Sequence, residues 1–173
     1  MKYRDKIIEA MEFIGKQPDT LFLGNGLLNG YRIYGTMDKV ELNRCSEMPV
    51  AENLKMGVAI GIALCKFVPV VIFPRMDFML IASDQIINHL CLMPKMSGEQ
   101  FKLPVIIRCI VGSQYMKFDV GHQHKKDFSS LFDPYMKVVR LEKDSDIVAE
   151  YKKAYESSEP TMLVEYKDLY TSE

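Results

Sequence analysis

Short runs of apolar residues alternate with amphipathic stretches along the chain. A continuous apolar run that ends at turn-forming residues is typical of a strand covered on both faces of a parallel sheet. This pattern predicts five strands, at residues 20–23, 68–73, 104–108, 136–141 and 161–165.

Apolar residues between these runs recur at helical spacing, which predicts helices at residues 3–15, 79–90 and 147–155. The tripeptide Asp144-Ser145-Asp146 predicts the N-cap of the last of these helices, because acidic and hydroxyl side chains bind the free N–H groups there.

The segment from Leu54 to Leu64 is different, because almost every residue in it is apolar or glycine. This composition predicts a helix hidden on nearly all sides. Gly57 and Gly61 lie four residues apart, so another backbone could approach closely along one line of the helix. We therefore expect an oligomer whose apolar interface includes this helix.

Strands that alternate with helices imply a three-layer α/β/α sandwich around a mostly parallel sheet. The length of 173 residues favours a single domain, residues 1–173. Residues 29–40 contain glycines and alternating aromatics and are expected to be irregular.

Charge and composition exclude several classes of protein. The 22 basic and 23 acidic residues nearly cancel, so no nucleic-acid or membrane-surface partner is expected. No apolar run reaches the roughly 18 residues that span a bilayer. The four scattered cysteines predict reduced thiols, and the N-terminal residues form no apolar signal core, so we expect a cytoplasmic protein.

The most informative segment runs from Pro49 through Val50, Ala51 and Glu52, with glycines five and nine residues after the glutamate. Here the sequence resembles the beta subunits of pyruvate-dehydrogenase-type decarboxylases, and more widely the pyrimidine-binding domain of thiamine-diphosphate enzymes of the 2-oxoacid dehydrogenase and transketolase type.

The resemblance continues without a gap and covers roughly residues 1 to 170. It is carried by the order and spacing of short motifs, namely Val68-Pro69-Val70, Asp77-Phe78, Asp84-Gln85-Ile86-Ile87-Asn88, Leu103 to Arg108, Gly121-His122-Gln123-His124 and Glu159 to Glu165.

The resemblance implies a specific role for Glu52. The family glutamate binds a ring nitrogen of the cofactor's aminopyrimidine and favours its imino tautomer, so that the exocyclic nitrogen takes the proton from the thiazolium carbon. From the residues alone, Glu52 is equally an ordinary acid in the first turn of a helix. Glu47 is a rival, but aligning it with the family glutamate would require an insertion before Gly57.

Other residues match family positions around the cofactor. Phe78 matches the aromatic that packs against the pyrimidine, with a core aromatic as the plain alternative. His124 matches a histidine that handles protons at the reactive end of the cofactor, with a surface loop histidine as the alternative. His122 and His124 have no clustered acid or thiol nearby, so no metal site is expected.

Three further positions are expected at the cofactor. Val50 matches a small hydrophobic residue of the motif. Asn25 stands where the family often has an acid, so that contact loses its charge. Pro74 stands where the family tends to have a methionine that reaches the cofactor, so that contact is altered.

The chain lacks Gly-Asp-Gly, the motif with which the family holds the diphosphate through a divalent metal. We therefore expect thiamine diphosphate to be shared with an alpha-type partner subunit that carries Gly-Asp-Gly and holds magnesium. The family's beta subunits also continue into a C-terminal domain, which a third chain could supply. The substrate would be a 2-oxo acid or a ketose. Two alternatives stay open: a transketolase-like ketol transferase subunit, and a non-catalytic interaction module derived from the fold.

Overall fold

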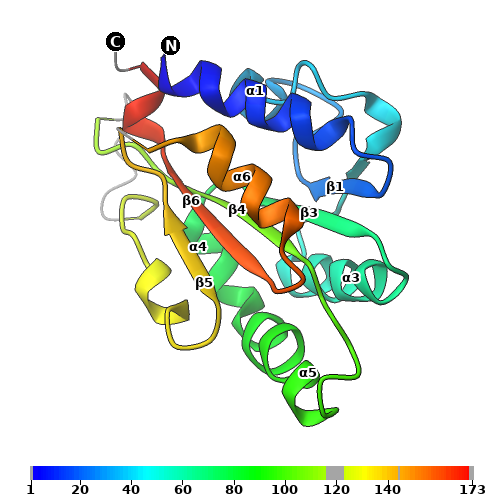
Figure 1. Ribbon diagram of the computed structural model, residues 1–173. Helices are drawn as coiled ribbons and strands as arrows, with labels where there is room; N and C mark the ends of the chain where they lie inside the picture. Colours follow the sequence, from blue (N-terminus) through cyan, green and yellow to red (C-terminus); the bar gives the residue numbers. More distant parts are fainter. Residues whose placement is uncertain (1, 116–122, 144, 172–173) are drawn as a thin grey trace.

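The computed structural model describes residues 2–115, 123–143 and 145–171. Within them, six parallel strands form one sheet in the order β2-β1-β3-β4-β6-β5 (Figure 1). The strands are β1 (Thr20–Gly24), β2 (Cys45–Glu47), β3 (Val68–Phe73), β4 (Ile106–Val111), β5 (Lys137–Arg140) and β6 (Thr161–Tyr166).

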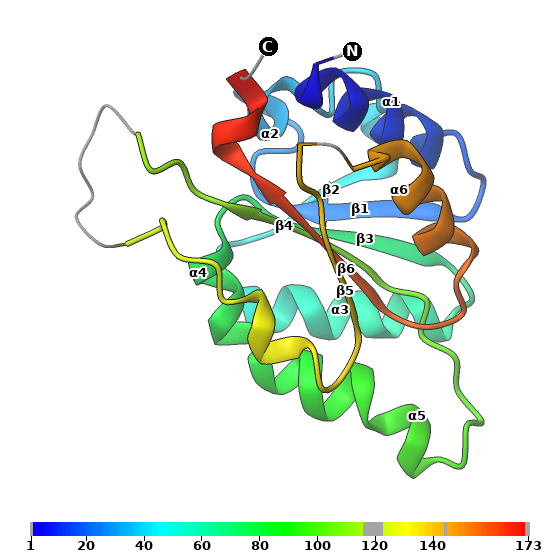
Figure 2. The ribbon, with the colours of Figure 1, turned by 60° about the vertical axis from the view of Figure 1, so that its left-hand side comes forward.

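Helices cover both faces of this sheet (Figure 2). One face carries α1 (Tyr3–Gly15) and α6 (Ile147–Glu156); the other carries α3 (Glu52–Leu64), α4 (Met76–Met79) and α5 (Met93–Met96). Side chains of β3 alternate between the two layers: Val70 and Ile72 join the core under α1 and α6, whereas Val71 and Phe73 join the core over α3. The three-layer α/β/α sandwich is confirmed, with every described strand parallel.

The expected strands and the first and last helices form close to their predicted bounds. Asp146 caps α6 as expected, because its Oδ1 accepts a hydrogen bond of 3.1 Å from the backbone N–H of Ala149. Strand β2 was not predicted, because its three residues form no apolar run and are at least partly exposed at the sheet edge.

The helix expected at residues 79–90 forms, but it is not one regular α-helix. The chain passes from α4 into a 3-10 helix, η2 (Leu80–Ala82), and then a π-helix, η3 (Gln85–Cys91). Pro94, which has no N–H to donate, then lies in the first turn of α5.

Helix α3 is not hidden on all sides within this chain either. Leu54 is 53% exposed and Leu64 is 44% exposed. Helix α3 has more apolar residues than its neighbours in the fold cover, so one apolar face of the helix is exposed to solvent.

The segment after β1 is irregular, as expected. It includes the short turn α2 (Arg32–Gly35), in which three consecutive non-glycine residues, Arg32, Ile33 and Tyr34, have positive φ angles of 37°, 46° and 61°. L-residues rarely adopt this left-handed region. The 3-10 helix η1 (Leu42–Arg44) leads from this segment into β2.

A buried polar cluster joins the sheet to the α1 and α6 layer. Arg108 of β4 has no exposed surface and forms two hydrogen bonds with Glu165 of β6, from Nε to Oε1 at 2.8 Å and from Nη2 to Oε2 at 2.9 Å. Arg108 also donates to the hydroxyl of Thr36 at 2.8 Å, and Tyr151 donates to Glu165 at 2.6 Å. The charges of this buried pair are therefore matched and hydrogen-bonded.

Candidate functional site

The residues singled out by the sequence come from loops at one edge of the sheet, where the parallel strands end (Figure 2). Asn25 follows β1, Glu52 follows β2 and begins α3, and Phe78 lies in α4 after β3. His124 belongs to the connection that follows β4. Ligands of open α/β sheets bind at this carboxyl edge.

Glu52 is the first residue of α3 and is 5% exposed. The free N–H groups of a helix start give that end a partial positive charge, which stabilises a carboxylate. Among the described residues, the one ion pair of this carboxylate is with Lys55, whose Nζ lies 4.0 Å from Oε1 of Glu52.

Lys55 is a residue to which the sequence analysis gave no role. Its side chain has no exposed surface, and its Nζ lies 3.3 Å from Oδ1 of Asn25, 3.3 Å from the carbonyl oxygen of Ile72 and 4.2 Å from the ring centre of Phe73. Burial lowers the pKa of Lys55 to about 8, although the nearby Glu52 opposes that change. One feature of the sequence could have identified Lys55: it is a single lysine inside an apolar run, three residues after Glu52.

Asn25, which follows β1, forms hydrogen bonds with the segment after β2 and with α3. Its Nδ2 donates to the carbonyl oxygen of Met48 at 2.5 Å, while its Oδ1 accepts from Lys55. An aspartate at this position could not donate to the Met48 carbonyl. The amide therefore suits this site, where the family often has an acid.

Glu47, the rival to Glu52, has a different set of contacts. Its carboxylate accepts hydrogen bonds from the backbone N–H groups of Gly26, Leu27 and Leu28, at 2.5, 2.8 and 3.1 Å. Burial tends to raise the pKa of Glu47, but these three N–H groups outweigh it and lower the pKa. Glu47 thus holds the loop after β1 in place.

His124, Asp77 and Phe78 form a second group at this edge. The rings of Phe78 and His124 meet edge to face with centroids 5.1 Å apart. The backbone N–H of His124 donates to Oδ1 of Asp77 at 3.1 Å, and Nδ1 of His124 lies 3.6 Å from Oδ2 of Asp77. Both of those last atoms are buried and form no hydrogen bond with any residue that the structure describes. Asp77 lies in one of the matched motifs, but the sequence alone indicated no role for it.

The close approach of His124 to β4 depends on Gly112. A Cβ atom at Gly112 would overlap the carbonyl oxygen of His124. The backbone of His124, which has a φ of +64°, can therefore pass here only because residue 112 has no side chain.

The remaining predicted positions differ in exposure. Val50 is 82% exposed, and Pro74 is half-buried and accepts a hydrogen bond of 3.3 Å from the hydroxyl of Tyr34. His122 lies outside the described residues. No group of three or more potential metal ligands of the His, Cys, Asp or Glu type occurs in the part of the chain that the structure describes.

Comparison with known proteins identifies the family of this fold. The family described as transketolase, pyrimidine binding domain, matches residues 1–173. The beta subunit of acetoin:2,6-dichlorophenolindophenol oxidoreductase from Cupriavidus necator is 32% identical over 130 residues, which cover 74% of this chain and 38% of that protein. The pyruvate dehydrogenase E1 component subunit beta of Chaetosphaeridium globosum is 30% identical over 173 residues, which cover 96% of this chain and 51% of the relative.

Among solved structures, a split gene transketolase described as an inactive beta4 tetramer has the same fold, with a TM-score of 0.73 and 21% identity. The match covers 95% of this chain and 51% of that one.

The fold and the matching family together define a thiamine-diphosphate-enzyme domain of the transketolase type. The chain belongs to the family of transketolase pyrimidine-binding domains and is similar to beta subunits of the pyruvate dehydrogenase E1 kind. It spans about half the length, or less, of the relatives named above. No helix among the described residues is long and apolar enough to cross a membrane.

Proposed function

We propose that residues 1–173 form a single pyrimidine-binding domain that supplies half of a thiamine-diphosphate site, with Glu52 as the residue that exchanges a proton with the aminopyrimidine. The observation that carries this proposal is the position of Glu52. It is a nearly buried carboxylate at the start of a 13-residue helix, on the sheet edge where ligands of such folds bind.

The chemistry of the side chains at this edge fits the cofactor's pyrimidine half. Glu52 offers a carboxylate to a ring nitrogen, and Phe78 offers an aromatic face to a flat ring. Nδ1 of His124 and Oδ2 of Asp77 are buried and have no hydrogen-bond partner within residues 2–115, 123–143 and 145–171, so this group has unused polar capacity beside the site.

Bound thiamine diphosphate would supply a carbon nucleophile for attack on a 2-oxo group. In our proposal Glu52 takes and returns a proton at its carboxylate, and Lys55 is the cation that faces that carboxylate. His124 moves protons near the substrate, and Asp77 holds its ring. Asn25, Val50 and Pro74 line the cofactor side of the edge.

The other half of the site would come from an alpha-type partner subunit with Gly-Asp-Gly, which holds magnesium and the diphosphate. The open face of α3 supports an assembly. Leu54, Gly61 and Leu64 recur on it at helical spacing, and Ile81 of η2 is 67% exposed. A soluble protein rarely leaves such apolar surface uncovered.

The substrate would be a 2-oxo acid or a ketose, and the reaction a decarboxylation, an acyl transfer or a ketol transfer. The similarity to pyruvate dehydrogenase beta subunits favours the 2-oxo acid. The fold shared with a split transketolase keeps ketol transfer as the second candidate. We place the protein in the cytoplasm on the strength of its unpaired cysteines.

Calorimetry with thiamine diphosphate and magnesium tests the shared site. The chain alone should bind the cofactor weakly or not at all, and binding should appear when the product of a neighbouring gene carrying Gly-Asp-Gly is added. Tight magnesium-dependent binding by this chain alone would refute a shared site.

A further inference from the structure

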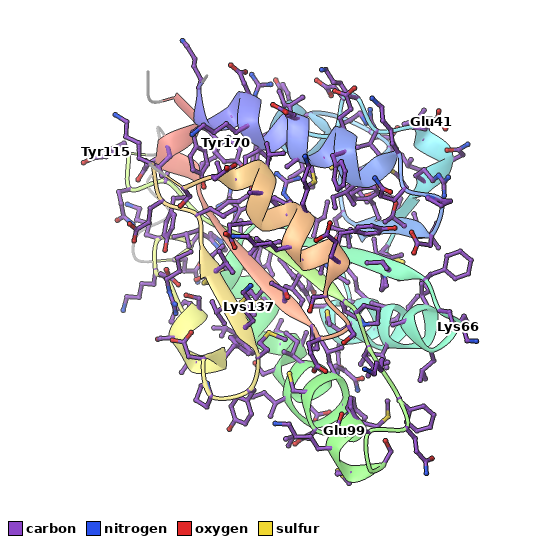
Figure 3. All side chains as sticks on the ribbon, in the orientation of Figure 1. Glu41, Lys66, Glu99, Tyr115, Lys137 and Tyr170 are labelled. Atoms are coloured by element: carbon purple, nitrogen blue, oxygen red, sulfur yellow. The ribbon has the colours of Figure 1, made fainter. Side chains whose placement is uncertain are left out.

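A second pocket lies beside the first turn of α1, next to the left-handed turn α2 and the C-terminal 3-10 helix η5 (Lys167–Thr171). Its volume is about 500 Å³, and the described residues that line it are Arg4, Tyr31, Tyr34, Lys167 and Tyr170. Figure 3 labels Tyr170, which lies near the N-terminal end of α1. None of these residues belongs to the site around Glu52.

Two cations line this pocket. Nζ of Lys167 lies 3.6 Å from the ring centre of Tyr34 and 4.4 Å from that of Tyr170. The guanidinium of Arg4 packs against Gly35, where a Cβ atom would overlap it. Among residues 2–115, 123–143 and 145–171, neither cation forms an ion pair with a carboxylate.

The acidic groups around the pocket have other partners or lie to one side. Glu165, beneath Tyr170, is paired with Arg108. The carboxylate of Asp168 accepts hydrogen bonds from Ser113 and the backbone of Gln114. Nη2 of Arg4 and Oδ2 of Asp38 both lie beside Gly35, so this carboxylate offsets part of the Arg4 charge without forming an ion pair with it. Burial, and after it the positive charge of Arg4, lowers the pKa of Lys167 to about 8. The pocket therefore has an excess of positive charge.

We propose that this pocket binds the phosphate group of a small phosphorylated compound, with Arg4 and Lys167 as its ligands and Tyr31 as an aromatic wall. The planar guanidinium of arginine suits two oxygens of one phosphate, and a lysine ammonium suits a third. The N-terminus of α1 adds partial positive charge. Tyr31 is 89% exposed, so its ring is free to stack on the organic part of the ligand.

One hydrogen bond connects this pocket to the sheet edge that carries the site around Glu52. Tyr34, whose ring lies under Lys167, donates its hydroxyl proton to the carbonyl oxygen of Pro74, directly after β3. Occupation of the pocket would therefore fix a side chain that contacts the loop next to Asp77 and Phe78.

Titration of the 173-residue chain with phenyl phosphate and with inorganic phosphate, at low ionic strength and pH 7, tests the proposal by NMR. Both probes should bind saturably. Arg4→Gln and Lys167→Gln should each weaken binding about tenfold or more, since each removes a charge-assisted contact. Lys167→Arg, which keeps the charge, should bind nearly as well as the parent, and Tyr31→Ala should weaken phenyl phosphate selectively.

Lys152→Gln is the matched control, because Lys152 also lies over an aromatic ring, 5.0 Å from the centre of Phe13, but outside the pocket. The affinity of the Lys152→Gln variant for both probes should be unchanged. Affinity should also fall above about pH 8, as Lys167 loses its proton, and below about pH 6, as the phosphate ester gains one. The proposal fails if neither probe saturates by about 20 mM on the scale of weak sites, or if both glutamine variants bind normally. It also fails if a phosphoserine peptide binds more tightly than phenyl phosphate, because the pocket would then belong to a protein partner.

Discussion

Nζ of Lys55 lies 4.0 Å from Oε1 of Glu52, one helical turn further along α3, and its side chain has no exposed surface. Coulomb attraction at this distance is much stronger in a protein interior than in water. Glu52 therefore lies beside two sources of positive charge, the ammonium of Lys55 and the N-terminal end of α3.

Glu52→Gln should nearly abolish turnover in the enzyme reconstituted with its partner chain. The amide has almost the same shape, so packing should survive, but it cannot exchange a proton as a carboxylate does. Loss of one such relay typically lowers the rate about 100-fold to 10,000-fold. The measurement is exchange of the thiazolium proton for deuterium, which needs no knowledge of the substrate.

Glu47→Gln is the control for that experiment. It should weaken the three backbone hydrogen bonds of the loop after β1 and lower stability by about 1–2 kcal/mol, while proton exchange persists. If Glu47→Gln stopped exchange and Glu52→Gln did not, the assignment of Glu52 would be wrong.

Lys55→Met should change how stability depends on pH. Burial lowers the pKa of Lys55 in the folded protein from 10.5 to about 8. Between these two values the unfolded chain binds a proton that the folded chain does not, so raising the pH favours folding. The unfolding free energy of the parent relative to the variant should therefore rise by up to about 3 kcal/mol between about pH 8 and 10.5.

Urea unfolding of both proteins at pH 7 to 10.5 measures this difference. The pKa of Lys167 is also lowered to about 8, but both proteins contain Lys167, so its contribution cancels in the difference. Parallel curves for the two proteins would show that Lys55 keeps its proton when folded.

Asp77→Asn should change the tautomer of His124. A carboxylate 3.6 Å from Nδ1 favours a proton on that nitrogen, and the neutral amide removes most of this preference. We expect turnover in the reconstituted enzyme to fall about 10-fold to 100-fold if His124 moves protons. ¹⁵N NMR of the imidazole nitrogens reads the tautomer directly.

Asp84→Asn is the matched control for Asp77, because Oδ2 of Asp84 lies 3.8 Å from Nδ1 of His89 on the exposed surface. That variant should leave both turnover and the His124 spectrum unchanged. An unchanged His124 spectrum in Asp77→Asn would remove the positioning role of Asp77.

Gly61→Leu should weaken assembly without harming the fold. A Cβ at Gly61 meets no other atom within 4 Å, so the chain itself has room for the larger side chain. Leucine also favours a helix over glycine by about 1 kcal/mol. Sedimentation velocity should show dissociation, whereas Lys153→Leu on α6 should not change the oligomer. An unchanged oligomer for Gly61→Leu would place the interface elsewhere.

The sequence predicted the layers and the strand positions because fully buried strands, such as Val68–Phe73, read as continuous apolar runs. It did not predict β2, whose polar residues pair only through the backbone at the sheet edge. It also overestimated the burial of α3, because composition records how apolar a helix is but not which of its faces a neighbour covers.

At the candidate site, the sequence indicated which residues to examine but not their contacts. Lys55 and Asp77 lie within the matched motifs, yet the significance of each depends on distances set by the three-dimensional fold. Nothing in the sequence singled out Gly112, because its close approach to His124 appears only when β4 and the following loop are placed together.

The cluster around Arg108 has a consequence for the order in which the chain folds. Its hydrogen-bond partners Glu165, Tyr170 and Thr36 lie 57, 62 and 72 residues away along the chain. Until those segments arrive, a guanidinium in the middle of β4 would be buried without a counter-charge, at a cost of several kcal/mol. Strand β4 therefore gains full burial only when β6 and the segment after β1 are both in place. The chain should therefore fold slowly, because these long-range contacts must form before β4 is fully buried.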